Sequence, residues 1–247
     1  MSTFNNRVAI VTGGNSGIGY ATAKALKAEG AKVIITGRRK EAIEKAAEEL
    51  GVTGIVADQS SLVATAQLVA QVSKDFGKVD VLFINAGVAH MLPIAQVTED
   101  HYDEIMNINL KGAYFTLNKF IPILNEGAAV VFLSSNTASF TNAGASVYAA
   151  SKAALNSVMR TAALELAPQK ITVNSVSPGP TQTEILNKSG HDAATLESLH
   201  AWMIERLPMK RLGTAEEVAK LVLHVAGDAG RFITGSDFVI DGGMIIA

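Results

Sequence analysis

The stretch Val8-Ala-Ile-Val-Thr-Gly-Gly-Asn-Ser-Gly-Ile-Gly-Tyr20 decides how this chain is expected to fold. A short apolar run is followed by a glycine-rich turn, and a helical pattern begins directly after it. Glycine lets the backbone turn tightly and approach a pyrophosphate, while a helix N-terminus offers free N–H groups. The residues expected to contact a dinucleotide here are Gly13, Asn15, Ser16, Gly17, Ile18 and Gly19. Glycine could also serve the turn alone, so the context of a strand before and a helix after carries the prediction.

Short apolar runs alternate with amphipathic segments along most of the remaining chain. The expected strands are residues 7–12, 32–36, 54–57, 79–85, 128–134, 171–176 and 237–240. The expected helices are residues 18–29, 40–50, 61–76, 100–125, 147–167 and 215–225. Buried parallel strands read as continuous apolar runs because helices cover both faces of the sheet. The pattern predicts an α/β fold, a single Rossmann-like doubly wound parallel sheet of about seven strands with helices on both faces.

One segment breaks this rhythm inside the single domain expected for residues 1–247. Residues 182–214 contain no strand pattern, only polar residues and a helical patch around 196–207. A long insertion directly after a strand is typical of a lid or binding loop. Its apolar residues predict a small-to-medium hydrophobic substrate, although packing of the lid helix explains them equally well. They are Leu186, Leu199, Trp202, Met203 and Leu207.

Composition excludes several function classes. The 247 residues are 48% hydrophobic and 18% charged, with a formal net charge of -2 and no cysteine. Disulfides, thiolate catalysis and cysteine-ligated metals are therefore excluded. The scattered histidines predict no metal site. No basic block suggests nucleic acid, and no apolar stretch approaches the roughly 20 residues of a membrane span, so a cytoplasmic protein is expected.

The end of the second expected strand bears on cofactor choice. An NAD site usually places Asp or Glu about 20 residues beyond the glycines, where it accepts from the ribose 2′-OH. This chain has Gly37-Arg38-Arg39 there. Arginine suits a 2′-phosphate, so NADP(H) is favoured over NAD(H), although Arg39 could be a solvated charge. Asp58 is expected beside the adenine, unless it only caps the next helix, and Gln59 is expected to contact the cofactor.

Tyr148 and Lys152 are the candidate proton-transfer pair. Four residues apart in a helical pattern, they share one helix face. A free tyrosine has a pKa near 10, and a neighbouring ammonium lowers it by favouring the phenolate. Such a pair alone is commonplace on protein surfaces, so its neighbours in the sequence matter. Ser135 precedes Tyr148 by 13 residues and follows an apolar strand, and Asn109 lies in an earlier helix.

With these residues, the chain resembles the short-chain dehydrogenase/reductase family from Val8 through Gly235 and the closing Asp241-Gly242-Gly243. The resemblance implies that Tyr148 exchanges a proton with the substrate oxygen, which Ser135 positions. It implies that Lys152 lowers the tyrosine pKa and binds the nicotinamide ribose, and that the backbone of Asn109 holds a relay water. The remaining residues that it places at the cofactor are Asn85, Ala86, Gly87, Pro178, Gly179, Thr181 and Thr183. Ser134 is a competitor of Ser135, and the 13-residue offset favours Ser135.

The function that follows is NADP(H)-dependent interconversion of a ketone or aldehyde and a secondary alcohol. Many NADP(H)-preferring members carry a basic residue just before Gly17, where this chain has Ser16, so the strictness of the preference stays open. A 3-oxoacyl-acyl-carrier-protein reductase is the main alternative. An acidic carrier protein requires a basic rim, and residues 124–128 carry no Lys or Arg, with only Lys170 nearby.

Two other functions compete with this one, and an oligomeric state is also expected. A nucleotide sensor without catalysis conflicts with the intact catalytic residues, and an enoyl reductase of the family has a longer tyrosine–lysine spacing. The resemblance implies a homotetramer built through the long helices. Val158, Ala162 and Leu166 are expected either at that interface or in the core of one chain.

Overall fold

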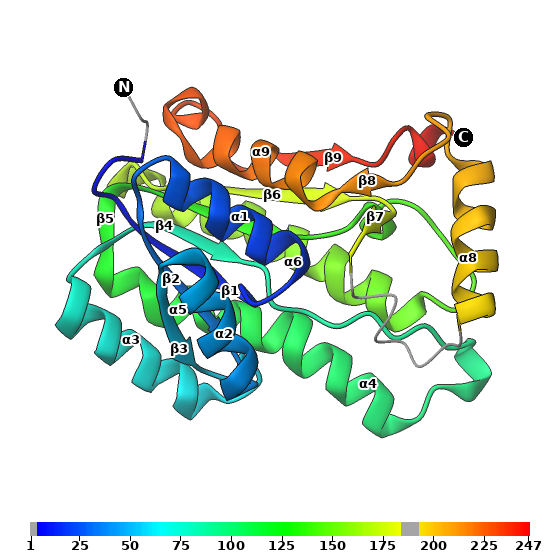
Figure 1. Ribbon diagram of the computed structural model, residues 1–247, viewed down its shortest axis with the longest axis horizontal. Coiled ribbons are helices and arrows are strands. Elements are labelled where there is room, and N and C mark those ends of the chain that lie inside the picture. The colour runs from blue at the N-terminus through cyan, green and yellow to red at the C-terminus, as the bar shows by residue number, and fades with distance from the viewer. Residues whose placement is uncertain (1–3, 184–192) are drawn as a thin grey trace.

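A parallel sheet with the strand order β3-β2-β1-β4-β5-β6-β9 runs through the molecule (Figure 1). The computed structural model describes residues 4–183 and 193–247, apart from the side chains at 193–197 and 199. The strands are β1 (Val8–Thr12), β2 (Lys32–Gly37), β3 (Thr53–Val56), β4 (Val79–Ile84), β5 (Leu124–Leu133), β6 (Thr172–Pro178) and β9 (Asp237–Ile240). Every pair in this sheet is parallel, as the continuous apolar runs predict.

Helices cover both faces of the sheet. Those packed in its two cores are α1 (Gly17–Ala28), α2 (Lys40–Leu50), α3 (Leu62–Phe76), α5 (Ala113–Phe120), α6 (Ser146–Leu166) and α9 (Ala215–Ala226). The chain also forms α4 (Glu99–Met106) and α8 (Ala193–Arg206). Alternate strand residues point into two separate cores, because successive side chains of a strand face opposite sides. Ile10 and Phe132 pack with α3, α5 and α6, whereas Val11 and Phe83 pack with α1, α2 and α9. The predicted doubly wound fold is confirmed.

Two details differ from the sequence prediction. The helix expected over residues 100–125 is divided into α4, a π-helical turn at Asn107–Gly112, α5 and a short 3-10 turn at Ile121–Ile123. Pro122 ends the helix because proline has no N–H to continue it, and β5 then begins at Leu124. Within residues 182–214, where no strand was expected, β7 (Thr181–Gln182) pairs with β8 (Gly213–Thr214). Two-residue strands show no periodicity in the sequence.

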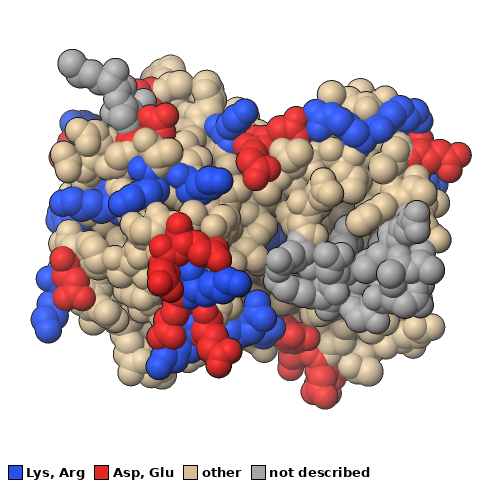
Figure 2. Space-filling view, viewed as in Figure 1, with Lys and Arg blue, Asp and Glu red and all other residues tan. Residues whose placement is uncertain are grey.

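Charges are distributed without one dominant sign on the visible face. Figure 2 shows basic and acidic side chains intermixed over α1 and α2. Among the described residues, no helix is both long and apolar enough to cross a membrane.

Candidate active site

The carboxyl ends of the central strands open into a cavity of about 470 Å³. That volume lies within the range of roughly 300–1,000 Å³ that is typical of small-molecule sites. The strand order reverses between β1 and β4, and ligands of open α/β sheets bind at such a switch point. The predicted residues that line the cavity are Gly13, Asn15, Ser16, Gly17, Ile18, Gly37, Arg38, Arg39, Asp58, Gln59, Asn85, Ala86, Gly87 and Thr183.

The glycine-rich turn forms one wall of the cavity. Gly13 has a φ of 65°, in the left-handed region that favours glycine. Gly19 lies behind the turn, where a Cβ would come within 2.3 Å of the Gly13 carbonyl oxygen. α1 begins at Gly17 without an acidic residue in its first turn, so no carboxylate there offsets the positive end of its dipole. This wall therefore fits an anionic group such as a pyrophosphate.

Asn85 holds this turn in place. Its Nδ2 donates to the carbonyl oxygens of Thr12 (2.8 Å) and Gly13 (3.1 Å). The Thr12 hydroxyl oxygen in turn accepts from the backbone N–H groups of Asn85 and Ala86, each at 2.9 Å. Sequence reasoning missed Thr12, although a polar residue at the carboxyl end of an apolar strand was a usable signal. The amide of Asn85 is thus occupied in fixing the backbone of the site.

Arg38 and Arg39 lie exposed at the carboxyl end of β2 and line the cavity. Neither forms an ion pair or a side-chain hydrogen bond within the described residues, so both guanidinium groups are available to a ligand. Gly37, next to them in the chain, is closely surrounded. A Cβ there would lie 3.0 Å from Asn15 Oδ1 and 2.9 Å from Ile43 Cδ1. A side chain at position 37 would therefore require the ends of the Asn15 and Ile43 side chains to shift. This corner fits a phosphate better than a free ribose hydroxyl.

Asp58 does not cap the following helix. Its Oδ1 accepts from the N–H and the hydroxyl of Ser60, at 2.9 and 2.8 Å, whereas Ser61 caps α3. The alternative that Asp58 caps this helix is thus wrong, because the N-cap residue of α3 is Ser61. Asp58 itself lies on the cavity wall.

Gln59 joins two parts of the site. It is 8% exposed, and its Nε2 donates to the carbonyl oxygens of Ala86 (2.9 Å) and Ile108 (3.1 Å). Ile108 belongs to the π-helical turn at Asn107–Gly112, a feature that is frequent at functional sites. The sequence suggested only a cofactor contact for Gln59. The structure adds a clamp between the Asn85-Ala86-Gly87 segment and the turn that carries Asn109.

Asn109 is buried at the centre of the π-helical turn. Its Oδ1 accepts from the Val88 N–H at 2.9 Å, and its Nδ2 donates to the Val88 carbonyl at 2.9 Å and to Ser151 Oγ at 3.3 Å. A Cβ at Gly87 would lie 3.1 Å from Asn109 Oδ1 and 3.6 Å from Lys152 Nζ. The side chain of Asn109 therefore joins the segment after β4 to α6, close to Lys152.

Tyr148 and Lys152 lie one turn apart on α6, as their spacing predicts. Lys152 is 4% exposed, and its Nζ donates to the Leu133 carbonyl at 2.7 Å and lies 5.8 Å from the centre of the Tyr148 ring. Burial lowers the pKa of Lys152 to about 8. Burial also raises the pKa of Tyr148, and a hydrogen bond with the Ser135 side chain partly opposes that rise.

The expected lowering of the Tyr148 pKa by Lys152 is therefore wrong for the protein without nucleotide. Desolvation disfavours the phenolate, and the lysine ammonium is directed to the end of β5. The Ser135 hydroxyl lies close enough to Tyr148 to lower the pKa of the phenol, which fits its offset in the sequence. Ser134 is buried and donates instead to the Lys152 carbonyl at 3.4 Å, so its hydroxyl faces the backbone of α6.

The residues after β6 shape the other end of the cavity. The Gly179 N–H donates to the Ile240 carbonyl at 3.0 Å, and Thr181 Oγ1 donates to the Gly179 carbonyl at 2.9 Å. Thr183 reaches the cavity wall. Pro178, Gly179 and Thr181 are not on that wall, and they fix the course of the chain toward Thr183.

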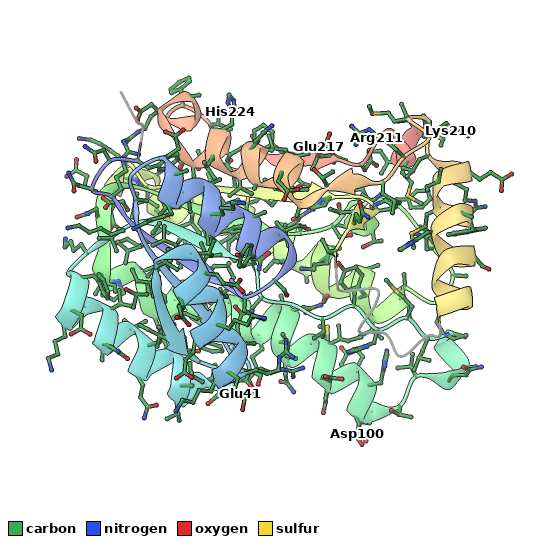
Figure 3. All side chains as sticks on the ribbon, in the orientation of Figure 1. Glu41, Asp100, Lys210, Arg211, Glu217 and His224 are labelled. Atoms are coloured by element: carbon green, nitrogen blue, oxygen red, sulfur yellow. The ribbon has the colours of Figure 1, made fainter. Side chains whose placement is uncertain are left out.

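An ion pair holds the base of the insertion. The guanidinium of Arg211 donates to both oxygens of Glu217 at 2.9 and 2.7 Å, close to where β8 meets α9 (Figure 3). Glu217 also accepts from the Thr214 N–H at 2.9 Å and completes the cap of α9. These contacts lower the pKa of Glu217 to about 2. They anchor β8, which pairs with β7 just before Thr183.

Only some of the apolar residues expected in the lid lie at the surface. Leu207 is 1% exposed and packs near Gly242, so it belongs to the core and not to a substrate surface. Trp202 is 43% exposed, with the Arg206 guanidinium 4.5 Å from its ring centre. Met203 is half-buried. Leu186 and the side chain of Leu199 lie outside the described residues.

Comparison with known proteins agrees with this geometry. A family model described as "Enoyl-(Acyl carrier protein) reductase" matches residues 13–245. A short-chain dehydrogenase/reductase structure from Brucella melitensis, titled glucose/ribitol dehydrogenase, is 31% identical, covers 99% of both chains and has a TM-score of 0.93. The chain belongs to the short-chain dehydrogenase/reductase family. It is therefore an oxidoreductase of that family.

Two further members of the family are similar over nearly their whole length. A short-chain dehydrogenase from Burkholderia cenocepacia, solved in complex with NADP, is 35% identical, with a TM-score of 0.88 and 99% of both chains covered. The 3-oxoacyl-[acyl-carrier-protein] reductase of Thermotoga maritima is 34% identical over 97% of this chain and 98% of its own length.

The structure corrects one inference about the substrate of this family member. Residues 124–128 begin β5, whereas Ser135 follows the opposite end of the same strand. Ten strand residues span about 30 Å, so residues 124–128 do not form the rim of the site in their own chain. Lys170 pairs there with Glu126 at 2.6 Å. The absence of basic residues in this stretch is therefore no argument against a carrier-protein substrate from within one chain.

The helix α6 also answers the question left open about Val158, Ala162 and Leu166. Ala162 is 7% and Leu166 4% exposed, and both belong to the core that α6 forms with the sheet. These two residues are thus core residues of one chain. Val158 is half-buried, and Leu164, on the outer side of α6, is 79% exposed.

Proposed function

We propose that this protein is an NADP(H)-dependent oxidoreductase that interconverts a ketone or aldehyde and a secondary alcohol, with Tyr148 as general acid and base. The observation that carries the proposal is the pairing of Tyr148 with Ser135 beside a buried Lys152, whose Nζ donates to Leu133 on the wall of the cavity that fits a dinucleotide. A neutral phenol and a serine hydroxyl can both donate to one carbonyl oxygen.

The residues that would hold the nucleotide follow from the cavity wall. The N-terminus of α1 would bind the pyrophosphate, Arg38 the 2′-phosphate, Asp58 the adenine and Thr183 the nicotinamide carboxamide. When bound, the nicotinamide supplies or accepts the hydride. The similarity to the Burkholderia cenocepacia enzyme in complex with NADP supports this choice of nucleotide.

In the reductive direction, Ser135 orients the carbonyl oxygen and Tyr148 gives its proton to that oxygen. The raised pKa of Tyr148 keeps the phenol protonated at neutral pH, which suits an acid. Lys152 has a pKa of about 8 and is mostly charged at pH 7, so it can stabilise the phenolate that remains. We propose that a water at the backbone of Asn109 then returns a proton through Lys152.

The main alternative is reduction of a 3-oxoacyl group on an acyl carrier protein. The name of the Thermotoga maritima relative favours it. The description of the matching family model names an enoyl reductase. Tyr148 and Lys152 are only four positions apart in the sequence, and this spacing favours carbonyl reduction. The exposed Trp202 and the half-buried Met203 of α8 favour a small free hydrophobic ketone. We further propose a cytoplasmic homotetramer.

The test is a screen of the purified protein with NADPH and NADH against ketones, secondary alcohols, 3-oxoacyl thioesters and enoyl thioesters. Oxidation of NADPH by a small ketone is the expected result. Tyr148→Phe should bind NADPH with near wild-type affinity and lose most turnover, whereas Tyr114→Phe, an exposed tyrosine on α5, should keep it. Full activity of Tyr148→Phe would contradict the mechanism. Activity on 3-oxoacyl thioesters alone would select the alternative, and reduction of the enoyl double bond alone would refute both.

A further inference from the structure

Ser135 receives two hydrogen bonds from one residue. The chain leaves β5 at Ser135 in an extended conformation and then forms a short 3-10 turn at Asn136–Ala138. The Thr137 N–H donates to Ser135 Oγ at 3.2 Å, and Thr137 Oγ1 lies 2.9 Å from the same oxygen. Ser135 is 7% exposed and Thr137 is half-buried. The N–H bond alone is sufficient to cap the turn, so the hydroxyl contact requires another explanation.

The hydrogen-bonding capacity of serine supplies that explanation. A serine hydroxyl has one proton and two acceptor lone pairs. If Thr137 donates through both its N–H and its hydroxyl, both lone pairs of Ser135 Oγ are used. The Ser135 proton is then left for the third neighbour, the Tyr148 side chain, whose pKa the Ser135 hydroxyl lowers. Donors that point into Ser135 Oγ also polarise its O–H and make it a better donor.

We propose that Thr137 is a positioning residue that holds Ser135 as a hydrogen-bond donor toward the reacting oxygen. This inference rests on the proposed function, because the reacting oxygen is the carbonyl oxygen of the substrate, and in the protein without substrate Ser135 faces the Tyr148 oxygen instead. Without the Thr137 hydroxyl, Ser135 can turn its proton toward other acceptors, and its contribution to both oxygens falls. Thr137 acts through Ser135 and does not itself contact the substrate oxygen.

The experiment compares Thr137→Val, which removes the hydroxyl and keeps the N–H, with Thr137→Ser, which keeps both donors. The matched control is Thr141→Val, the same change at an exposed position of the same loop. With the ketone found in the screen, Thr137→Val should lower kcat about three- to tenfold, the effect of one lost hydrogen bond. KM for NADPH should stay unchanged. Thr137→Ser and Thr141→Val should stay within about twofold of wild type.

Two readouts separate this role from a structural one. In a Ser135→Ala background, Thr137→Val should cause no further loss, because its effect passes through Ser135. In the protein without substrate, the pKa of Tyr148 should rise by about half a unit to one unit in Thr137→Val. Carbon-13 NMR of ring-labelled tyrosine measures that rise, with Tyr148 assigned by its absence in Tyr148→Phe, and circular dichroism monitors folding at each pH.

The NMR titration needs no turnover, so it decides the inference even if the screen finds no substrate and the proposed function fails. A wild-type Tyr148 titration in Thr137→Val would overturn the inference. Equal losses of kcat in Thr137→Val and Thr137→Ser would also overturn it, as would additive losses in the Ser135→Ala background. If Thr137→Val does not fold, Thr137→Ala against Thr137→Ser gives the same comparison.

Discussion

Lys152→Met is expected to stabilise the protein without nucleotide and to abolish turnover. Burial lowers the pKa of this lysine from 10.5 to about 8. Because one pKa unit corresponds to roughly 1.4 kcal/mol, the buried charge costs the folded state about 3 kcal/mol at pH 7. Methionine has a similar length and no charge. Loss of the bond to the Leu133 carbonyl removes about 1 kcal/mol, so a net gain of about 2 kcal/mol is expected.

The pH dependence of the gain identifies its cause. The folded-state pKa of Lys152 lies below its unfolded value, so between about pH 8 and 10.5 the unfolded chain binds one more proton than the folded chain. The stability of the wild type therefore rises with pH across this window, and that of Lys152→Met lacks this rise. The advantage of the variant should be full near pH 7 and largely gone near pH 10.5.

Thermal unfolding of nucleotide-free protein at pH 7 and at pH 9.5 measures both effects. A gain of about 2 kcal/mol corresponds to a rise in Tm of about 4–8 °C for a chain of this size. Lys24→Met, at an exposed position of α1, is the control and should leave Tm nearly unchanged. A lower Tm for Lys152→Met at pH 7, or an advantage that stays constant with pH, would refute the reasoning.

Two other predictions test the walls of the cavity. Arg38→Ala should raise KM for NADPH about tenfold or more and leave KM for NADH within about twofold, because a charge-assisted bond to the 2′-phosphate is lost. Arg39→Ala is the comparison variant. An equal rise in KM for both nucleotides in Arg38→Ala would exclude the 2′-phosphate role. Gln59→Leu should lower the free energy of unfolding by about 1–3 kcal/mol in urea denaturation, because the Ala86 and Ile108 carbonyls lose their shared donor. Unchanged stability of Gln59→Leu would show that the clamp contributes nothing.

Local patterns in the sequence were sufficient for the architecture. Apolar runs locate the strands, because a parallel strand covered on both faces needs apolar residues on both sides. The order strand, glycine-rich turn, helix at residues 8–20 places the cavity wall that fits an anionic group. The four-residue spacing places Tyr148 and Lys152 on one face of α6. Each of these features depends on residues close together in the chain, and pattern reasoning reads such features directly.

Only the tertiary structure decided which hydrogen bonds join the residues of the site and in which direction their pKa values shift. Asn85 bonds to Thr12 and Gly13, more than 70 positions away, and Gln59 reaches Ile108. No local pattern specifies such partners, because they depend on which strands become neighbours. The direction of the Tyr148 pKa shift likewise depends on burial by the fold, which is a larger influence than the Ser135 hydroxyl. The sequence determines which groups are present, and the fold determines their solvation and partners, which control their chemistry.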